Sequence, residues 1–122
     1  MNFDIQRSDA LHARVQGFIH AASGGSAPPE SFDALACDIA RHQAACGTGL
    51  ERLLASAGRA PESLQLAAEI PAIPTDAFKF RRIACHPPEL DGRVFRTSGT
   101  TIGARGEHPV RTTATYEAAA IA

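Results

Sequence analysis

The stretch from residue 28 to residue 58 decides the fold, and it reads PPESFDALACDIARHQAACGTGLERLLASAG. Its two leading prolines favour the start of a helix, because the first turn of a helix leaves its amide hydrogens unbonded in any case. Apolar residues then recur at helical spacing until Gly47 ends the helix; they are Phe32, Leu35, Ala36, Ile39 and Cys46. This apolar stripe requires a second surface to pack against, so we expect packed helices.

Further helices are predicted on both sides of this one. Downstream, Thr48 and Glu51 have the spacing of a capping box, and Gly58 ends the short helix that they would begin. Its apolar face consists of Leu50, Leu53, Leu54 and Ala57. Upstream, Ser8 stands where an N-cap is expected, and a helix from there would end at Gly24. Its apolar residues are Leu11, Val15, Phe18, Ile19 and Ala22.

The second half of the chain has a different pattern. Two prolines force extended backbone at 70–74, and Thr75 is placed to cap a brief helix that runs through Phe80. A strand is predicted at 93–97, where polar and apolar residues alternate, and a helix at 113–122. No stop signal precedes Ala122, so we expect the sequence to be a fragment of a longer protein.

The predicted fold class is therefore mainly α in the first half, leading into the start of an α/β domain. We divide the chain into a helical region at 1–69 and a second region at 70–122. The length of 122 residues, with 44% hydrophobic and 20% charged residues, suits one modest core.

Charge and cysteine content exclude several classes of function. The 12 basic and 13 acidic residues nearly balance, which argues against a nucleic-acid or membrane-surface partner. Three cysteines make an odd number without the dense spacing of a disulfide scaffold, and this favours a reducing compartment. The start lacks a secretory signal, and no apolar run is long enough for a membrane helix. We expect a cytoplasmic protein.

One segment carries chemistry, and it reads Thr97-Ser98-Gly99-Thr100-Thr101-Ile102-Gly103. It combines hydroxyl donors, exposed backbone amides and glycines that allow close approach to an anion, which are the groups that polyphosphate binding needs. A Walker loop is excluded because no Gly-Lys-Ser/Thr is present. The pattern predicts a phosphate cradle; the alternative is a small-residue turn without chemical function.

The residues around this segment resemble a known family. Phe95-Arg96-Thr97-Ser98-Gly99-Thr100-Thr101 is similar to the first signature of the adenylate-forming ligases. The continuation through Gly106-Glu107-His108-Pro109 to Tyr116 resembles the acyl-protein synthetase branch, which includes the fatty-acid ligase component of bacterial bioluminescence. The upstream segment 70–80 also resembles the part of that branch that precedes the signature.

The resemblance implies an α/β catalytic domain that binds ATP and Mg²⁺ and activates a carboxylic acid, such as a fatty acid, as an acyl-adenylate. The acyl group would then pass to a thiol or to a protein acceptor such as a reductase or carrier protein. At the matching positions, the nucleotide-phosphate loop would consist of Thr97, Ser98, Gly99, Thr100, Thr101 and Gly103. None of these is a general base, and the fragment alone is expected to be inactive.

Two positions depart from the wider family pattern. Ile102 follows the threonine pair where glycine is commonest, and Arg105 stands near the position that often carries lysine. Arginine can still pair with phosphate, in a bidentate manner. The family's acyl-accepting cysteine is expected outside this sequence, so Cys37, Cys46 and Cys85 do not inherit that role.

Metal and nucleophile sites are not predicted from the cysteines. On one helix, His42 and Cys46 would point about 140° and about 180° away from Cys37, so these three side chains would not converge on one ion. Cys85 and His86 are adjacent in the sequence, where side chains rarely face each other, and Cys85 is interpreted as a loop cysteine without a chemical role.

Other residues are given ordinary roles. His12, His20 and His108 are interpreted as surface or capping residues, with His108 a secondary candidate because it follows the loop. Arg81-Arg82 is interpreted as a solvated charge pair, or, in the ligase interpretation, as the lining of an entrance or of an inter-domain face. The alternative for the whole chain is a free-standing helical module that binds a partner protein and has no catalytic activity.

Overall fold

Helices dominate the computed structural model, which describes residues 3–97 and 105–121. Its α-helices are α1 (Ile5–Ser23), α2 (Phe32–Ala45), α3 (Leu50–Ser56), α4 (Ala77–Phe80) and α5 (Ala114–Ala120). One small antiparallel sheet consists of β1 (Arg93–Arg96) and β2 (Glu107–Val110), and three short 3₁₀ turns cover Pro61–Ser63, Ala67–Glu69 and Pro88–Leu90. The prediction of a helical first half is confirmed.

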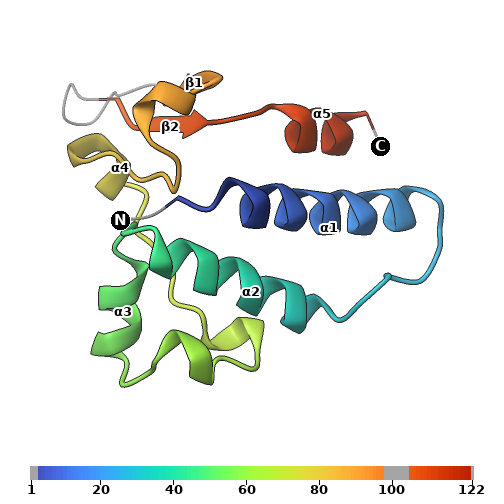
Figure 1. Ribbon diagram of the computed structural model, residues 1–122, viewed down its shortest axis with the longest axis horizontal. Coiled ribbons are helices and arrows are strands. Elements are labelled where there is room, and N and C mark those ends of the chain that lie inside the picture. Colours follow the sequence, from blue (N-terminus) through green and yellow to red (C-terminus); the bar gives the residue numbers. More distant parts are fainter. Residues whose placement is uncertain (1–2, 98–104, 122) are drawn as a thin grey trace.

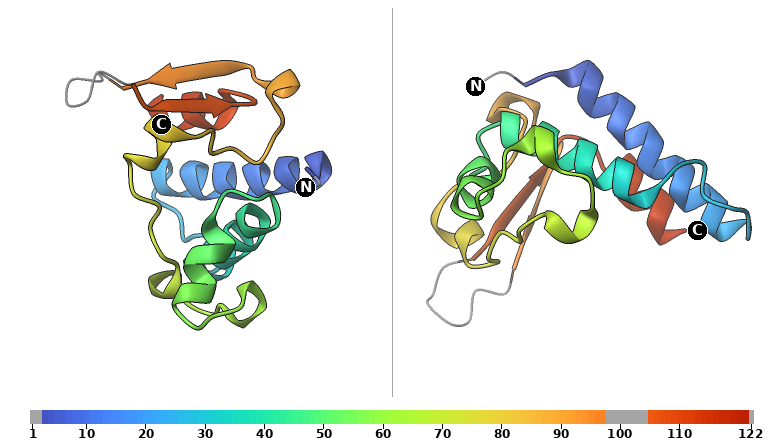
Figure 2. Two further views of the ribbon diagram at one scale, coloured as in Figure 1. Left: turned by 90° about the vertical axis from the view of Figure 1, so that its left-hand side faces the viewer. Right: turned by 90° about the horizontal axis from the view of Figure 1, so that it is seen from below.

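Helix α1 lies in the middle of the molecule. It packs against α2 on one side and against α5 on the other, as the side-by-side helices in Figure 1 show. The β1–β2 hairpin lies near α4, at the end of the molecule away from the α5 terminus (Figures 1 and 2). The two regions predicted from the sequence are therefore in contact through α1 and α5.

The hydrophobic core lies between α2, α3 and the segment that follows α3. Its buried members are Cys37, Ala40, Ala44, Leu50, Leu54 and Leu64, with the half-buried Ile70 and Ile73 packed against them. The predicted stripe on α2 is only partly correct, because Phe32 is 67% exposed while Cys37 is buried. Helix α2 contacts α1 as well as α3, so more than one of its faces is covered.

Two helix starts differ from the prediction. Asp4, and not Ser8, caps α1, since its carboxylate accepts a hydrogen bond from the Arg7 amide at 2.9 Å. Ser31 caps α2 by accepting from the Ala34 amide at 3.2 Å. In both cases a short polar side chain lies close enough to the first free amides to satisfy one of them.

The start of α3 also differs from the predicted capping box. Gly49 is the N-cap, and its φ of 93° is a backbone conformation that glycine adopts without strain. The Thr48 hydroxyl instead donates to the Gln43 carbonyl at 2.9 Å and closes the end of α2. The predicted stop at Gly58 is confirmed by its φ of 72° and by the backbone bond from Arg59 to Leu54 at 2.9 Å.

In the second half, the structure adds a strand that the sequence analysis did not predict. Strand β2 pairs with β1 in the register Arg93↔Val110 to Arg96↔Glu107. Pro109 lies within β2, and because the sheet has two strands in the described part of the chain, a proline without an amide hydrogen is tolerated at its edge. Helix α5 confirms the predicted C-terminal helix with shorter bounds. No helix in the described ranges combines the length and the apolar character needed to cross a bilayer.

An ion-pair network joins α1 to α2. Arg14 bonds Glu30 at 2.5 Å and 2.8 Å and Asp38 at 2.8 Å. Arg41 bonds Asp38 at 2.7 Å and donates to the Leu64 carbonyl, also at 2.7 Å. The Arg14 guanidinium lowers the pKa of both carboxyl groups below their usual values, so the network stays charged around neutral pH.

The core position of Leu54 gives a test of this fold. Leu54 is 0% exposed, so Leu54→Ala should lower the free energy of unfolding by about 2–5 kcal/mol through lost burial and a new cavity. Leu66 is 52% exposed, and Leu66→Ala should change that free energy by less than about 0.5 kcal/mol. Urea denaturation followed by circular dichroism measures both; equal effects would contradict this core.

Candidate functional site

A β-hairpin carries the predicted phosphate loop, whereas we expected a strand on one side only. Two hydrogen bonds join the two ends of the loop where it leaves the sheet. The Thr97 amide donates to the Gly106 carbonyl at 3.0 Å, and the Gly106 amide donates to the Thr97 hydroxyl at 2.8 Å. A hydroxyl that accepts one hydrogen bond can still donate its own proton. Thr97 therefore supports the loop and has a hydroxyl proton that it can donate to an anion.

The remaining predicted loop residues lie outside the described part of the chain; they are Ser98, Gly99, Thr100, Thr101 and Gly103. The base of the loop is tightly packed. A Cβ atom on Gly106 would lie 3.3 Å from the Thr97 hydroxyl oxygen and 3.5 Å from the Phe78 Cβ. Glycine at this position thus allows the close approach of the two strands to α4.

A basic pocket of about 340 Å³ lies beside this loop base, between α4 and the hairpin. The residues that line it include four basic ones, Lys79, Arg81, Arg82 and Arg105, and two acidic ones, Asp91 and Glu107. Each carboxylate is already ion-paired, Asp91 to Arg82 and Glu107 to Arg96. The pocket therefore has an excess of positive charge, which favours an anionic ligand.

Arg82 is exposed, as the interpretation of a solvated charge predicts, but it is also ion-paired and lines the basic pocket. Its guanidinium binds both oxygens of Asp91, at 2.7 Å and 2.9 Å, and donates to the His86 carbonyl at 2.9 Å. The His86 ring completes the cluster with Nε2 2.7 Å from an Asp91 oxygen. Arg82 lowers the pKa of Asp91 to about 2, and His86 adds to this shift. The cluster fixes the loop that leads into β1.

A second and larger cavity, of about 590 Å³, lies between α1, α2, β2 and the segment around Cys85. Four histidines line it, His12, His42, His86 and His108, together with many apolar side chains. Burial lowers the pKa of His12 and of His42, so both rings favour the neutral form. The sequence did not predict that these four histidines line one cavity, because they come from different elements that are distant in the chain.

The individual histidines differ in their contacts. His12 is half-buried, and its Nδ1 lies 2.7 Å from the Thr115 hydroxyl of α5, so it joins two helices and is not a surface residue. His108 stacks on Phe78 with ring centroids 4.2 Å apart, and this contact holds β2 against α4. His20 is exposed in the last turn of α1, in agreement with the prediction for that residue.

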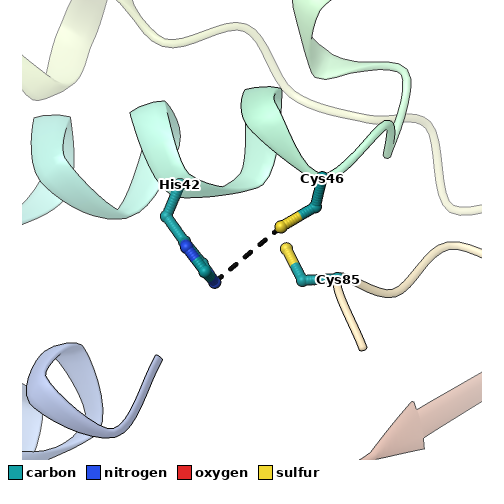
Figure 3. A group of neighbouring side chains, drawn as sticks. All are labelled: His42, Cys46 and Cys85. Atoms are coloured by element: carbon teal, nitrogen blue, oxygen red, sulfur yellow. Dashed lines mark hydrogen bonds between the residues drawn. The ribbon is translucent and has the colours of Figure 1, made fainter. Parts of the chain in front are cut away.

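The cysteines are arranged in a way that the sequence analysis predicted only in part. Cys37 lies in the hydrophobic core, apart from His42 and Cys46, as the helical angles predict. Cys85, however, brings its sulfur to the same place as the other two side chains, and the ligand atoms of His42, Cys46 and Cys85 all lie within 4.8 Å of one another (Figure 3). Cys85 reaches the other two side chains because the segment between α4 and β1 packs against the end of α2.

Comparison with known proteins found no relative of this chain. The chain matches no protein-family model, and neither a curated protein nor a solved structure shows significant similarity to it. The likeness of residues 70–116 to the acyl-protein synthetases therefore stays a prediction, and functional inference rests on the residues and their geometry.

The loop base can be tested through Thr97. In Thr97→Val the side chain keeps its shape but loses the oxygen that accepts from the Gly106 amide, which should lower stability by about 1 kcal/mol. Amide exchange followed by NMR should show much faster exchange at Gly106. Thr97→Ser keeps the oxygen and should retain slow exchange; if both variants exchange equally fast, the hydroxyl does not close the loop.

The Asp91 cluster gives a pH prediction. The folded-state pKa of about 2 lies below the ordinary value of 3.8, so the carboxylate stabilises the fold above about pH 4 and this contribution is lost as the pH falls towards 2. Asp91→Asn should therefore be less stable than the parent at neutral pH and lose less stability on acidification. Urea denaturation across this pH range measures both slopes. Equal slopes in the parent and in Asp91→Asn would contradict this role of Asp91.

Proposed function

We propose that this chain is the N-terminal part of an ATP-dependent ligase that activates a carboxylic acid as an acyl-adenylate and transfers the acyl group to a thiol. The observation that carries the proposal is the hydroxyl- and glycine-rich segment 97–103, which is flanked by paired strands and by a pocket with excess positive charge. A polyphosphate needs donors and compensating cations in one place, and this end of the molecule supplies both.

In this proposal the loop residues, Thr97 and Arg105 have different roles in phosphate binding. Donors from the loop would bind the nucleotide phosphates, and Thr97 would position the loop while keeping its own hydroxyl proton available. Arg105 enters the basic pocket directly after the loop, where a guanidinium can bind a phosphate through two hydrogen bonds. When bound, Mg²⁺ would neutralise further charge as pyrophosphate leaves.

The 122-residue chain by itself is not expected to catalyse the reaction. Adenylation requires a carboxylate pocket and adenine contacts around the phosphates, and one hairpin beside a helical layer does not enclose a nucleotide. The acyl acceptor, a small thiol or a protein such as a reductase or carrier protein, would meet the remaining part of the protein.

The second candidate is a helical module that binds a partner protein. Several large apolar side chains on the described helices are exposed, including Phe32 at 67%, Phe80 at 73% and Tyr116 at 63%. These residues lie on α2, α4 and α5. An interaction module would use such residues at an interface with its partner. This candidate gives no account of the basic pocket beside the loop.

The test is carboxylate-dependent exchange of labelled pyrophosphate into ATP, measured on the complete reading frame that contains this chain. Ser98→Ala and Thr100→Ala should each reduce exchange by about 100-fold or more, because each removes a donor to the phosphates. Thr75→Ala changes an exposed threonine outside the loop; Asp76, and not Thr75 as predicted, is the N-cap of α4, so this variant serves as the matched control, with exchange expected to stay unchanged.

The outcomes separate the two candidates. Exchange that requires a carboxylate and falls in both loop variants supports the ligase. If short and long carboxylates give no exchange at all, the ligase proposal fails and the interaction module becomes the better explanation. Equal exchange in the loop variants and the control would mean that these hydroxyls do not contact the phosphates.

A further inference from the structure

Two side chains at the end of α2 lie on one face of that helix. His42 and Cys46 are four residues apart, a spacing that places side chains one turn above each other. The His42 Nε2 atom lies 3.8 Å from the Cys46 sulfur. Cys85 approaches this pair from the segment between α4 and β1, with its sulfur directed towards that of Cys46 (Figure 3).

These distances suit a tetrahedral metal ion. Zinc binds sulfur at about 2.3 Å and imidazole nitrogen at about 2.0 Å, which places two sulfur ligands about 3.8 Å apart and a sulfur and a nitrogen about 3.6 Å apart. The nitrogen–sulfur distance in the structure is 3.8 Å, and no pair of the three ligand atoms exceeds 4.8 Å. Shifts of about 1 Å or less would complete the geometry.

The surroundings also favour a cation with thiolate ligands. His42 and Cys46 are buried and Cys85 is partly buried. A buried thiolate needs a compensating charge, and a divalent cation bound by two thiolates supplies it. Both α2 ligands lie at the C-terminal end of the helix, which carries a partial negative charge.

We propose that His42, Cys46 and Cys85 bind one zinc ion, which joins the end of α2 to the segment that leads into the hairpin. The ligand set of two sulfurs and one nitrogen is typical of zinc among the common biological metals. His42 and Cys85 also line the 590 Å³ cavity, so a water molecule or a ligand that enters it takes the fourth position. The zinc site rests on these three residues and not on the proposed ligase activity.

The other chemistry open to this cluster is a disulfide between Cys46 and Cys85. A disulfide would use only two of the three side chains and leave the 3.8 Å contact of His42 with Cys46 unexplained. A bound cation uses all three side chains, so the geometry favours the metal.

The experiment is metal titration of the reduced 122-residue chain. Addition of Co²⁺ should produce the charge-transfer absorption of thiolate–cobalt bonds together with the intense visible bands of tetrahedral cobalt, and Zn²⁺ should abolish both at about one equivalent. Cys85→Ser should weaken Zn²⁺ binding by more than about 100-fold in competition with a coloured chelator, since even outer-shell changes weaken metal binding by 10- to 100-fold.

Matched variants keep the test independent of folding. Cys85 is only partly buried, so Cys85→Ser should retain the parental circular dichroism spectrum; Cys37→Ala removes a cysteine from the core and should keep full Zn²⁺ affinity. The proposal is overturned if the reduced parent chain gives no thiolate–cobalt absorption, or if Cys37→Ala and Cys85→Ser lose affinity equally. Failure of pyrophosphate exchange would leave this result unaffected.

Discussion

Helix α2 is covered on more than one face, since it contacts α1 as well as α3 and the turns that follow α3. Small side chains such as Ala40 and Ala44 allow α3 and Leu64 to approach the helix closely on the core side. Towards α1, the Arg14 network holds the helices together through charged hydrogen bonds. The positions of α1, α3 and the extended segment around Ile70 all follow from this arrangement.

The direction of α2 also determines where chemistry can occur. Its C-terminal end carries His42 and Cys46 to the larger cavity, and the chain that returns from α4 brings Cys85 to the same point. The Arg82–Asp91–His86 cluster then fixes that returning segment just before β1. The cysteine–histidine cluster and the hairpin therefore share one short, well-anchored connection.

The hairpin and the basic pocket form a separate end of the molecule. Charge there comes from α4, from the segment after it and from Arg105 beyond the loop. Among the described residues, α1, α2, α3 and α5 contribute none of the charged residues that line this pocket. Helices α1 and α5 position the chain that follows β2 through contacts such as His12 with Thr115. A rigid scaffold with a short loop at one end is the usual way in which proteins present binding groups.

The sequence by itself determined the helical first half, the extended joint at 70–74, the stop at Gly58 and the chemical character of segment 97–103. These features depend on neighbouring residues, because helical periodicity, glycine conformations and proline restrictions act locally. Only the tertiary structure decided which faces of α2 are buried, that β2 pairs with β1, and that Cys85 lies against His42 and Cys46. These outcomes depend on contacts between segments distant in the sequence, and no local pattern encodes the packing that brings such segments together.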